Sequence, residues 1–170
     1  MKKPEKIKVT LKLPLVEIEG TWVPNENEWQ AAWEMYVELI TRISVAELRK
    51  DEGLLREALS SLYSLFETTR NVLRKYGPAV ATPKGPDDLS FGYLAVTILN
   101  MVLRPLLSKW HPLLLDYENS REKTVSPLKH EQSWEKAEEL RKALNDTRKI
   151  LIDYANLLAQ VAGVPSLIIE

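Results

Sequence analysis

Residues 6–13 alternate between polar and aliphatic side chains, whereas most of the chain after residue 25 repeats its apolar positions every three or four residues. Strict alternation is typical of a half-buried β-strand, and here it places Ile7, Val9 and Leu11 on one face and lysines on the other. After Pro14 the alternation resumes in the opposite phase, as a bend at residues 13–15 would produce. We therefore predict an extended β arm over residues 1–24.

Four later segments have the helical period. A capping pair of Asn25 and Glu28 starts the first, which continues to about residue 44 or 49 and carries Trp29 and Trp33 on its apolar stripe. Gly77-Pro78 stops the second, which opens near residues 51 and 52. The third is the nearly all-apolar segment 91–107, capped by Asp87 or Asp88 and followed by an irregular connection from Trp110-His111-Pro112. The fourth runs from Ser126-Pro127 to Gly163.

The order of these segments predicts a mainly α fold, an antiparallel four-helix bundle over residues 25–170 that carries the β arm within a single domain. Segment 91–107 is shorter than the roughly 20 residues of a membrane span and contains Arg104 near its end. We therefore expect a buried central helix and no membrane partner.

Composition narrows the function classes. The 170 residues include 23 basic and 24 acidic side chains, a net charge of −1, so the whole protein has no electrostatic drive toward nucleic acid. The chain has no cysteine, which excludes disulfides and thiolate sites. The Met-Lys-Lys start is not followed by the apolar block of a signal peptide, and a cytoplasmic location is expected.

Recognised catalytic and metal motifs are missing from the sequence. It contains no G-x-S-x-G, P-loop, G-x-G-x-x-G or H-E-x-x-H, and neither histidine follows a glutamate by three residues. We therefore expect no metal and no cofactor, and a protein that is not an enzyme is favoured.

The segment around Pro105 is the best candidate for a ligand site. Proline removes a backbone donor and disfavours the helical conformation at Arg104, so a kink with a freed carbonyl near Met101 is expected. Arg104 would then meet Arg70 and His111 in a pocket for a small anion or nucleotide. Asp116 or Glu118 would orient these groups. The structural alternative is that Arg104 pairs internally with one of those two carboxylates.

The β arm needs hydrogen-bond partners for its backbone. Three sources are open: residues 164–169, a hairpin within residues 6–23, or a strand edge of another molecule. Because Leu13 to Val16 has no turn chemistry, the hairpin is the least favoured, and strand addition to another molecule is preferred. The predicted contacts with a protein partner or a second copy are Lys6, Lys8, Thr10 and Lys12 on the arm and Trp134 on the fourth helix. Trp134 lies off the apolar stripe of that helix, so the alternative is that it covers the connection around His111.

The runs AAWEMYVELITR at residues 31–42 and GLLREALSSLY at 53–63, with LRP at 103–105 and WHP at 110–112, resemble a family of small uncharacterised bacterial helical proteins. The resemblance implies a role beside larger proteins in bacterial regulatory or defence systems and supplies no catalytic residue. The preferred hypothesis is thus a non-enzymatic helical bundle that binds protein. The alternative is a small-anion or nucleotide sensor or enzyme that uses the arginine and histidine pocket.

Overall fold

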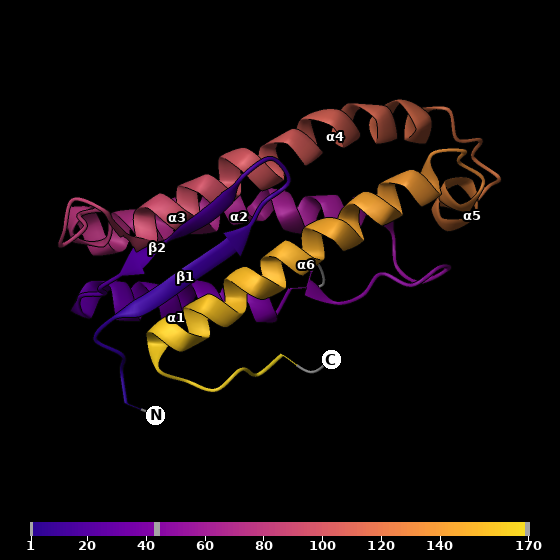
Figure 1. The fold of residues 1–170 in the computed structure, drawn as a ribbon. Coiled ribbons are helices and arrows are strands. Elements are labelled where there is room, and N and C mark those ends of the chain that lie inside the picture. Colours follow the sequence, from indigo (N-terminus) through magenta and orange to yellow (C-terminus); the bar gives the residue numbers. More distant parts are fainter. Residues whose placement is uncertain (1, 43–44, 169–170) are drawn as a thin grey trace.

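The computed structural model describes residues 2–42 and 45–168, and it is mostly helical with a small sheet formed near the N-terminus (Figure 1). The mainly α class predicted from the sequence is confirmed. In chain order the elements are β1 Ile7–Lys12, β2 Glu17–Trp22, α1 Glu26–Ile40, α2 Leu55–Tyr76, η2 Gly77–Val80, β3 Asp88–Leu89, α3 Phe91–Thr97, η3 Ile98–Leu103, α4 Arg104–Asn119, α5 Pro127–Gln132 and α6 Ala137–Ala162.

The β arm pairs with itself, which corrects the prediction that a hairpin was its least favoured partner. β1 and β2 are antiparallel from Ile7 opposite Trp22 to Lys12 opposite Glu17, and the Leu13 N–H donates to the Val16 carbonyl at 2.9 Å beyond them. Of the predicted partner segment 164–169, residues 164–168 form no strand, and residue 169 lies outside the described chain. The hairpin forms because this register buries the apolar face of both strands and leaves their charged face exposed. Burial of that face outweighs the poor turn residues.

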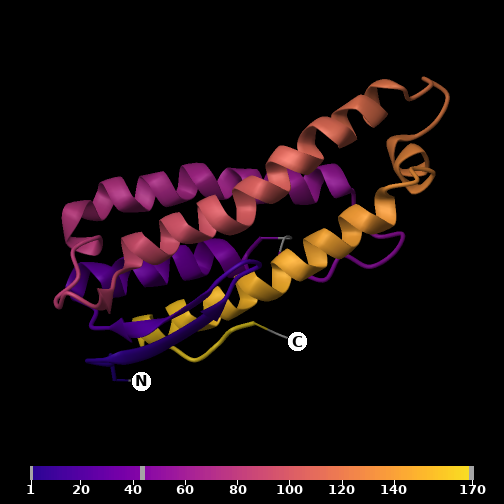
Figure 2. The ribbon, with the colours of Figure 1, turned by 45° about the horizontal axis from the view of Figure 1, so that its top comes forward.

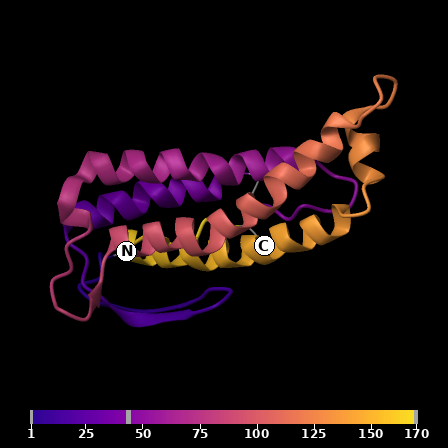
Figure 3. The same ribbon diagram turned by 90° about the horizontal axis from the view of Figure 1, so that it is seen from above.

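The sheet lies against one side of the helices, as Figures 2 and 3 show. β1 packs on α6, and β2 is joined in parallel to the short strand β3. Behind them α1 contacts both α2 and α6, and α2 contacts α3, η3 and α4. The apolar face of β1 and the apolar stripes of the helices form one continuous hydrophobic core.

Glu28 joins the sheet to two helices. The predicted capping box is present: the Asn25 side chain accepts from the Glu28 N–H at 3.0 Å, and Glu28 Oε2 accepts from the Asn25 N–H at 2.9 Å. Glu28 Oε1 also accepts from Trp22 Nε1 at 3.0 Å and from the Phe91 N–H at 2.9 Å. Burial raises the pKa of this carboxyl, and the hydrogen bonds it accepts oppose the rise. α1 then ends at Ile40, earlier than predicted, and residues 43–44 lie outside the described chain.

The third helix is longer than predicted. α3, η3 and α4 are continuous from Phe91 to Asn119, so the irregular connection expected at residues 110–112 is wrong: Pro112 lies inside α4. The helix begins at Ser90, whose hydroxyl accepts from the Tyr93 N–H at 3.2 Å, and not at Asp87 or Asp88.

A π-helical turn, η3, lies directly before Pro105, where the sequence predicted a kink. In η3 the Arg104 N–H donates to the carbonyl of Leu99, five residues back. Pro105, which has no N–H to donate, directly follows this turn at the start of α4. The helix changes direction along this part of the chain (Figure 3).

The helix Phe91–Asn119 is long and apolar enough to cross a membrane by length and composition, but half of its apolar window is buried inside the fold. A core helix of a soluble protein passes the same test of length and composition. The central position predicted for it is therefore only partly correct, because Tyr93, Val96 and Met101 are exposed.

The predicted fourth helix is divided in two. Ser126 caps α5 as predicted, accepting from the Lys129 N–H at 3.2 Å, but α5 ends at Gln132. α6 runs from Ala137 to Ala162 and is followed by Gly163, whose φ of 72° is the left-handed conformation that glycine favours at a helix end.

Candidate functional site

A cavity of about 310 Å³ lies between α2 and α4, and we call it the α2–α4 cavity. On each helix the residues that line the cavity are three or four positions apart, a spacing that keeps side chains on one face of a helix. The lining residues are Tyr63, Phe66 and Arg70 from α2 and Arg104, Leu107, Ser108 and His111 from α4. Three residues nominated from the sequence, Arg70, Arg104 and His111, therefore lie around one cavity.

The positive charges of Arg70 and Arg104 lie at the wall of this cavity. Arg104 Nε donates to Asn100 Oδ1 at 3.1 Å, and its guanidinium carbon lies 5.2 Å from the centre of the Phe66 ring. Within residues 2–42 and 45–168, neither Arg70 nor Arg104 forms an ion pair. Both arginines are exposed, so water screens their charges until a ligand displaces it.

The alternative in which Arg104 pairs with Asp116 or Glu118 is wrong. Because α4 is one unbroken helix, a rise of about 1.5 Å per residue separates Arg104 from both carboxylates by about 20 Å along the axis. Asp116 is exposed and does not line the cavity, and Glu118 pairs with another arginine.

That arginine is Arg56, at the start of α2. Its Nε donates to Glu118 Oε1 at 2.9 Å, and its Nη2 donates to Glu118 Oε2 at 2.9 Å. Its Nη1 lies 2.6 Å from His111 Nδ1. An arginine can only donate, so His111 Nδ1 accepts and the neutral ring carries its proton on Nε2. Burial and the Arg56 charge lower the pKa of His111, with Glu118 acting in the opposite direction. At neutral pH His111 is therefore an uncharged donor at the cavity wall.

Sequence reasoning missed Arg56, although a signal existed. Arg56, Tyr63 and Arg70 follow one another at seven-residue intervals on α2, as Arg104, His111 and Glu118 do on α4. Antiparallel helices would pair these rows in reverse order. The prediction of an irregular chain after Trp110 hid the second row.

Trp134 lies in the interior, with 8% of its surface exposed. Its ring stacks on Tyr117 at 5.3 Å between centroids and meets Trp110 edge-on at 6.1 Å. These contacts hold the short link between α5 and α6 against α4. The predicted partner contact at Trp134 is corrected accordingly, because its ring is covered by the chain itself.

Glu131, on α5, holds the beginning of α2. Leu54 caps that helix with no side-chain hydrogen bond, and the buried Glu131 carboxylate instead accepts from the Leu55 N–H at 2.9 Å. Burial raises the pKa of Glu131, and the backbone N–H groups of Leu55 and Arg56 oppose the rise. The position of Arg56, and through it of His111, therefore depends on α5.

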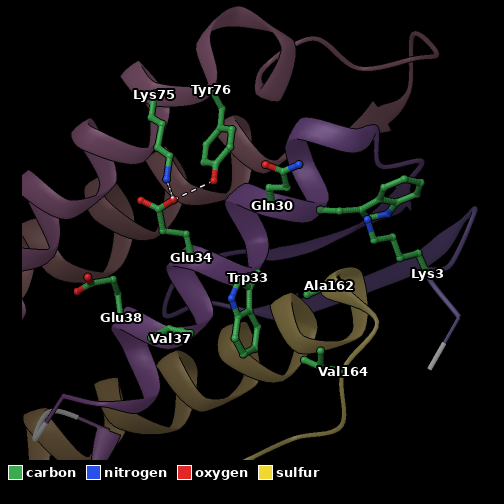
Figure 4. Close-up of a pocket in the computed structure, with 11 residues that line it drawn as sticks. Lys3, Gln30, Trp33, Glu34, Val37, Glu38, Lys75, Tyr76, Ala162 and Val164 are labelled. Atoms are coloured by element: carbon green, nitrogen blue, oxygen red, sulfur yellow. Dashed lines mark hydrogen bonds and ion pairs between the residues drawn. The ribbon is translucent and has the colours of Figure 1, made fainter.

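A larger hollow, of about 590 Å³, lies over α1 (Figure 4). Trp33, predicted to be in the core, is 43% exposed here and extends toward Ala162 and Val164. On the other side Glu34 accepts from Lys75 Nζ at 2.5 Å and from the Tyr76 hydroxyl at 2.9 Å. Because these polar groups satisfy each other, this hollow is the weaker candidate for a ligand site.

No group of three or more metal-ligating side chains occurs within the described ranges. Comparisons with protein-family models, with curated proteins and with solved structures found no match, and the resemblance to a family of small bacterial proteins stays a prediction.

Proposed function

We propose that the α2–α4 cavity binds a small ligand that has a phosphate or carboxylate group attached to a flat apolar body. The observation that carries the proposal is the position of Arg70 and Arg104, which line one cavity without a carboxylate partner in the described chain. Guanidinium groups form paired hydrogen bonds with phosphate and carboxylate oxygens, and they gain strength when a ligand excludes water.

The other lining residues support a ligand with an anionic end and an apolar end. His111 Nε2–H and the Ser108 hydroxyl are further donors for the anionic end. Phe66, Leu107 and the ring of Tyr63 offer apolar surface for the other end. Arg56, which is paired with Glu118, contacts His111 Nδ1 and acts as a positioning group.

The size of the cavity limits the ligand. A volume of about 310 Å³ is at the lower end of the roughly 300–1,000 Å³ of small-molecule sites. A single aromatic ring with one anionic group matches that volume better than a dinucleotide does. We propose a binding or sensing role without catalysis, in a cytoplasmic protein whose long helices form an antiparallel four-helix bundle.

A protein-binding function was preferred because the β arm was expected to lack a partner strand in its own chain. The pairing of β1 with β2 removes this reason. β1 and β2 satisfy each other along one edge of each strand, so the arm does not require another molecule in order to be stable. The hypothesis of a small-anion or nucleotide ligand is therefore better supported than that of a protein-binding bundle.

The test uses phenyl phosphate and inorganic phosphate as probes, titrated into the full chain and followed by NMR of the His111 ring and by isothermal calorimetry. Arg104→Ala and Arg70→Ala should each weaken phenyl phosphate binding by about tenfold or more, since a hydrogen bond to a charged group contributes about 1.5–3 kcal/mol. Arg74→Ala is the matched control, because it removes one charge from α2 outside the cavity.

Phenyl phosphate should bind more tightly than inorganic phosphate, owing to the apolar walls. Equal affinity of the wild type and an Arg70→Ala/Arg104→Ala double variant would refute the site. An equal loss in Arg74→Ala would show attraction by net charge alone and would refute it as well.

A further inference from the structure

The outer edge of β1 is open. β1 is the first strand in the sheet order β1-β2-β3, so one edge of it faces no strand within the described part of the chain. Bonded and non-bonded pairs alternate along an antiparallel ladder. Because the Leu13 N–H bonds to Val16, the same alternation directs the backbone groups of Leu11, Val9 and Ile7 toward β2. The N–H and C=O groups of Lys8, Thr10 and Lys12 therefore point to the open edge.

The two faces at this edge differ sharply. Lys6, Lys8 and Lys12 have exposed side chains on the outer face, whereas Ile7, Val9 and Leu11 are at most 1% exposed on the inner face. A strand added beside β1 would set every second side chain next to the lysines and the alternate ones next to the aliphatic row. Acidic residues suit the first set and apolar residues suit the second.

β2 already illustrates this match on the opposite edge of β1. Its Glu17 stands opposite Lys12, its Glu19 stands opposite Thr10, and Ile18 between them is buried. A second copy of β1 would instead place lysines beside lysines, and like charges on neighbouring strands are destabilising. Charge complementarity therefore selects an acidic strand and disfavours self-association through this edge.

We propose that the open edge of β1 docks an extended segment of a protein partner in which acidic and aliphatic residues alternate. Backbone hydrogen bonds to Lys8, Thr10 and Lys12 supply affinity, and the lysine side chains supply selectivity. This surface is separate from the α2–α4 cavity, so neither proposal depends on the other.

The probe is a short peptide that alternates glutamate with isoleucine and valine, compared with a peptide in which every glutamate is lysine. Binding to the full chain is measured by fluorescence anisotropy, and the contact is located by the amide NMR shifts of Lys8, Thr10 and Lys12. The acidic peptide should bind, more weakly as salt is added, and the basic peptide should not.

Thr10→Pro tests the backbone contact. Proline removes the outward N–H, and it is tolerated on an edge strand where that group faces solvent. Affinity for the acidic peptide should fall by about tenfold or more. Thr10→Val is the matched control, because it keeps the N–H and should bind as the wild type does. A Lys8→Glu/Lys12→Glu variant should reverse the preference toward the basic peptide, which keeps the test valid if Thr10→Pro fails to fold.

Absence of binding by the acidic peptide would overturn the proposal, as would equal binding of both peptides. A dimer of the wild-type chain in sedimentation that Thr10→Pro dissociates would also overturn it, because the occupant would then be a second copy.

Discussion

Glu28→Ala is expected to lower the free energy of unfolding by about 2–6 kcal/mol, because it leaves two buried N–H donors without an acceptor at about 1–3 kcal/mol each. The donors are the indole of Trp22 and the backbone N–H of Phe91, and both residues are 0% exposed. A third donor, the N–H of Asn25, is only partly buried and can turn to water. The loss is large beside the roughly 5–15 kcal/mol that stabilise a typical domain.

Glu28→Gln separates hydrogen bonding from charge. The amide oxygen still accepts from Trp22 and Phe91, which share Oε1 in the wild type, and the amide nitrogen faces the Asn25 N–H. The expected loss is therefore about 1 kcal/mol, that of a weakened cap. Both variants are measured by urea unfolding followed by tryptophan fluorescence and by circular dichroism.

The pH dependence supplies a second readout. Burial raises the pKa of Glu28 above its ordinary 4.5, so the folded protein keeps this proton at a higher pH than the unfolded chain does. The stabilisation that protonation of Glu28 contributes is therefore fully present below the ordinary pKa, and it is lost as pH rises through the raised pKa. Glutamine does not titrate, so the free energy of unfolding of the wild type should rise relative to that of Glu28→Gln as pH falls from neutral. A loss below about 1 kcal/mol in Glu28→Ala, or equal losses in both variants, would refute the role assigned to the carboxylate.

Two further predictions concern the groups behind the cavity. Arg56→Met should raise the pKa of His111 measured by NMR titration, because it removes the neighbouring positive charge and leaves Glu118 unopposed; an unchanged pKa would contradict the Arg56 contact, and Arg74→Met is the control. Glu131→Ala should lower the free energy of unfolding by about 1–2 kcal/mol in urea, since the first turn of α2 loses its only side-chain acceptor at Leu55 among the described residues. Glu131→Gln should lose less, and equal stability of Glu131→Ala and the wild type would exclude the capping role.

The cavity could be predicted only in part. Arg70, Arg104 and His111 were found from helical spacing and from the proline beside Arg104, which are features of short stretches of chain. Arg56 was missed because its partner Glu118 is 62 positions away, and their contact exists only once α2 and α4 are antiparallel. The burial of Trp134 could not be predicted either. Its position off the apolar stripe of its helix suggested a surface residue, but in the folded chain its ring packs against Tyr117 and Trp110.

Alternation, helical period and caps determined the strand of residues 7–12, the apolar stripes of the long helices, and the helix starts at Asn25 and Ser126. These features act between residues a few positions apart, so they can be recognised wherever they occur. Tertiary structure alone decided that the β arm pairs with itself, that α4 continues through Pro112, and that Glu28 and Glu131 serve as acceptors for distant backbone groups. The physical reason is that each of these outcomes depends on how much apolar surface the packed elements bury together, which no short stretch of sequence specifies.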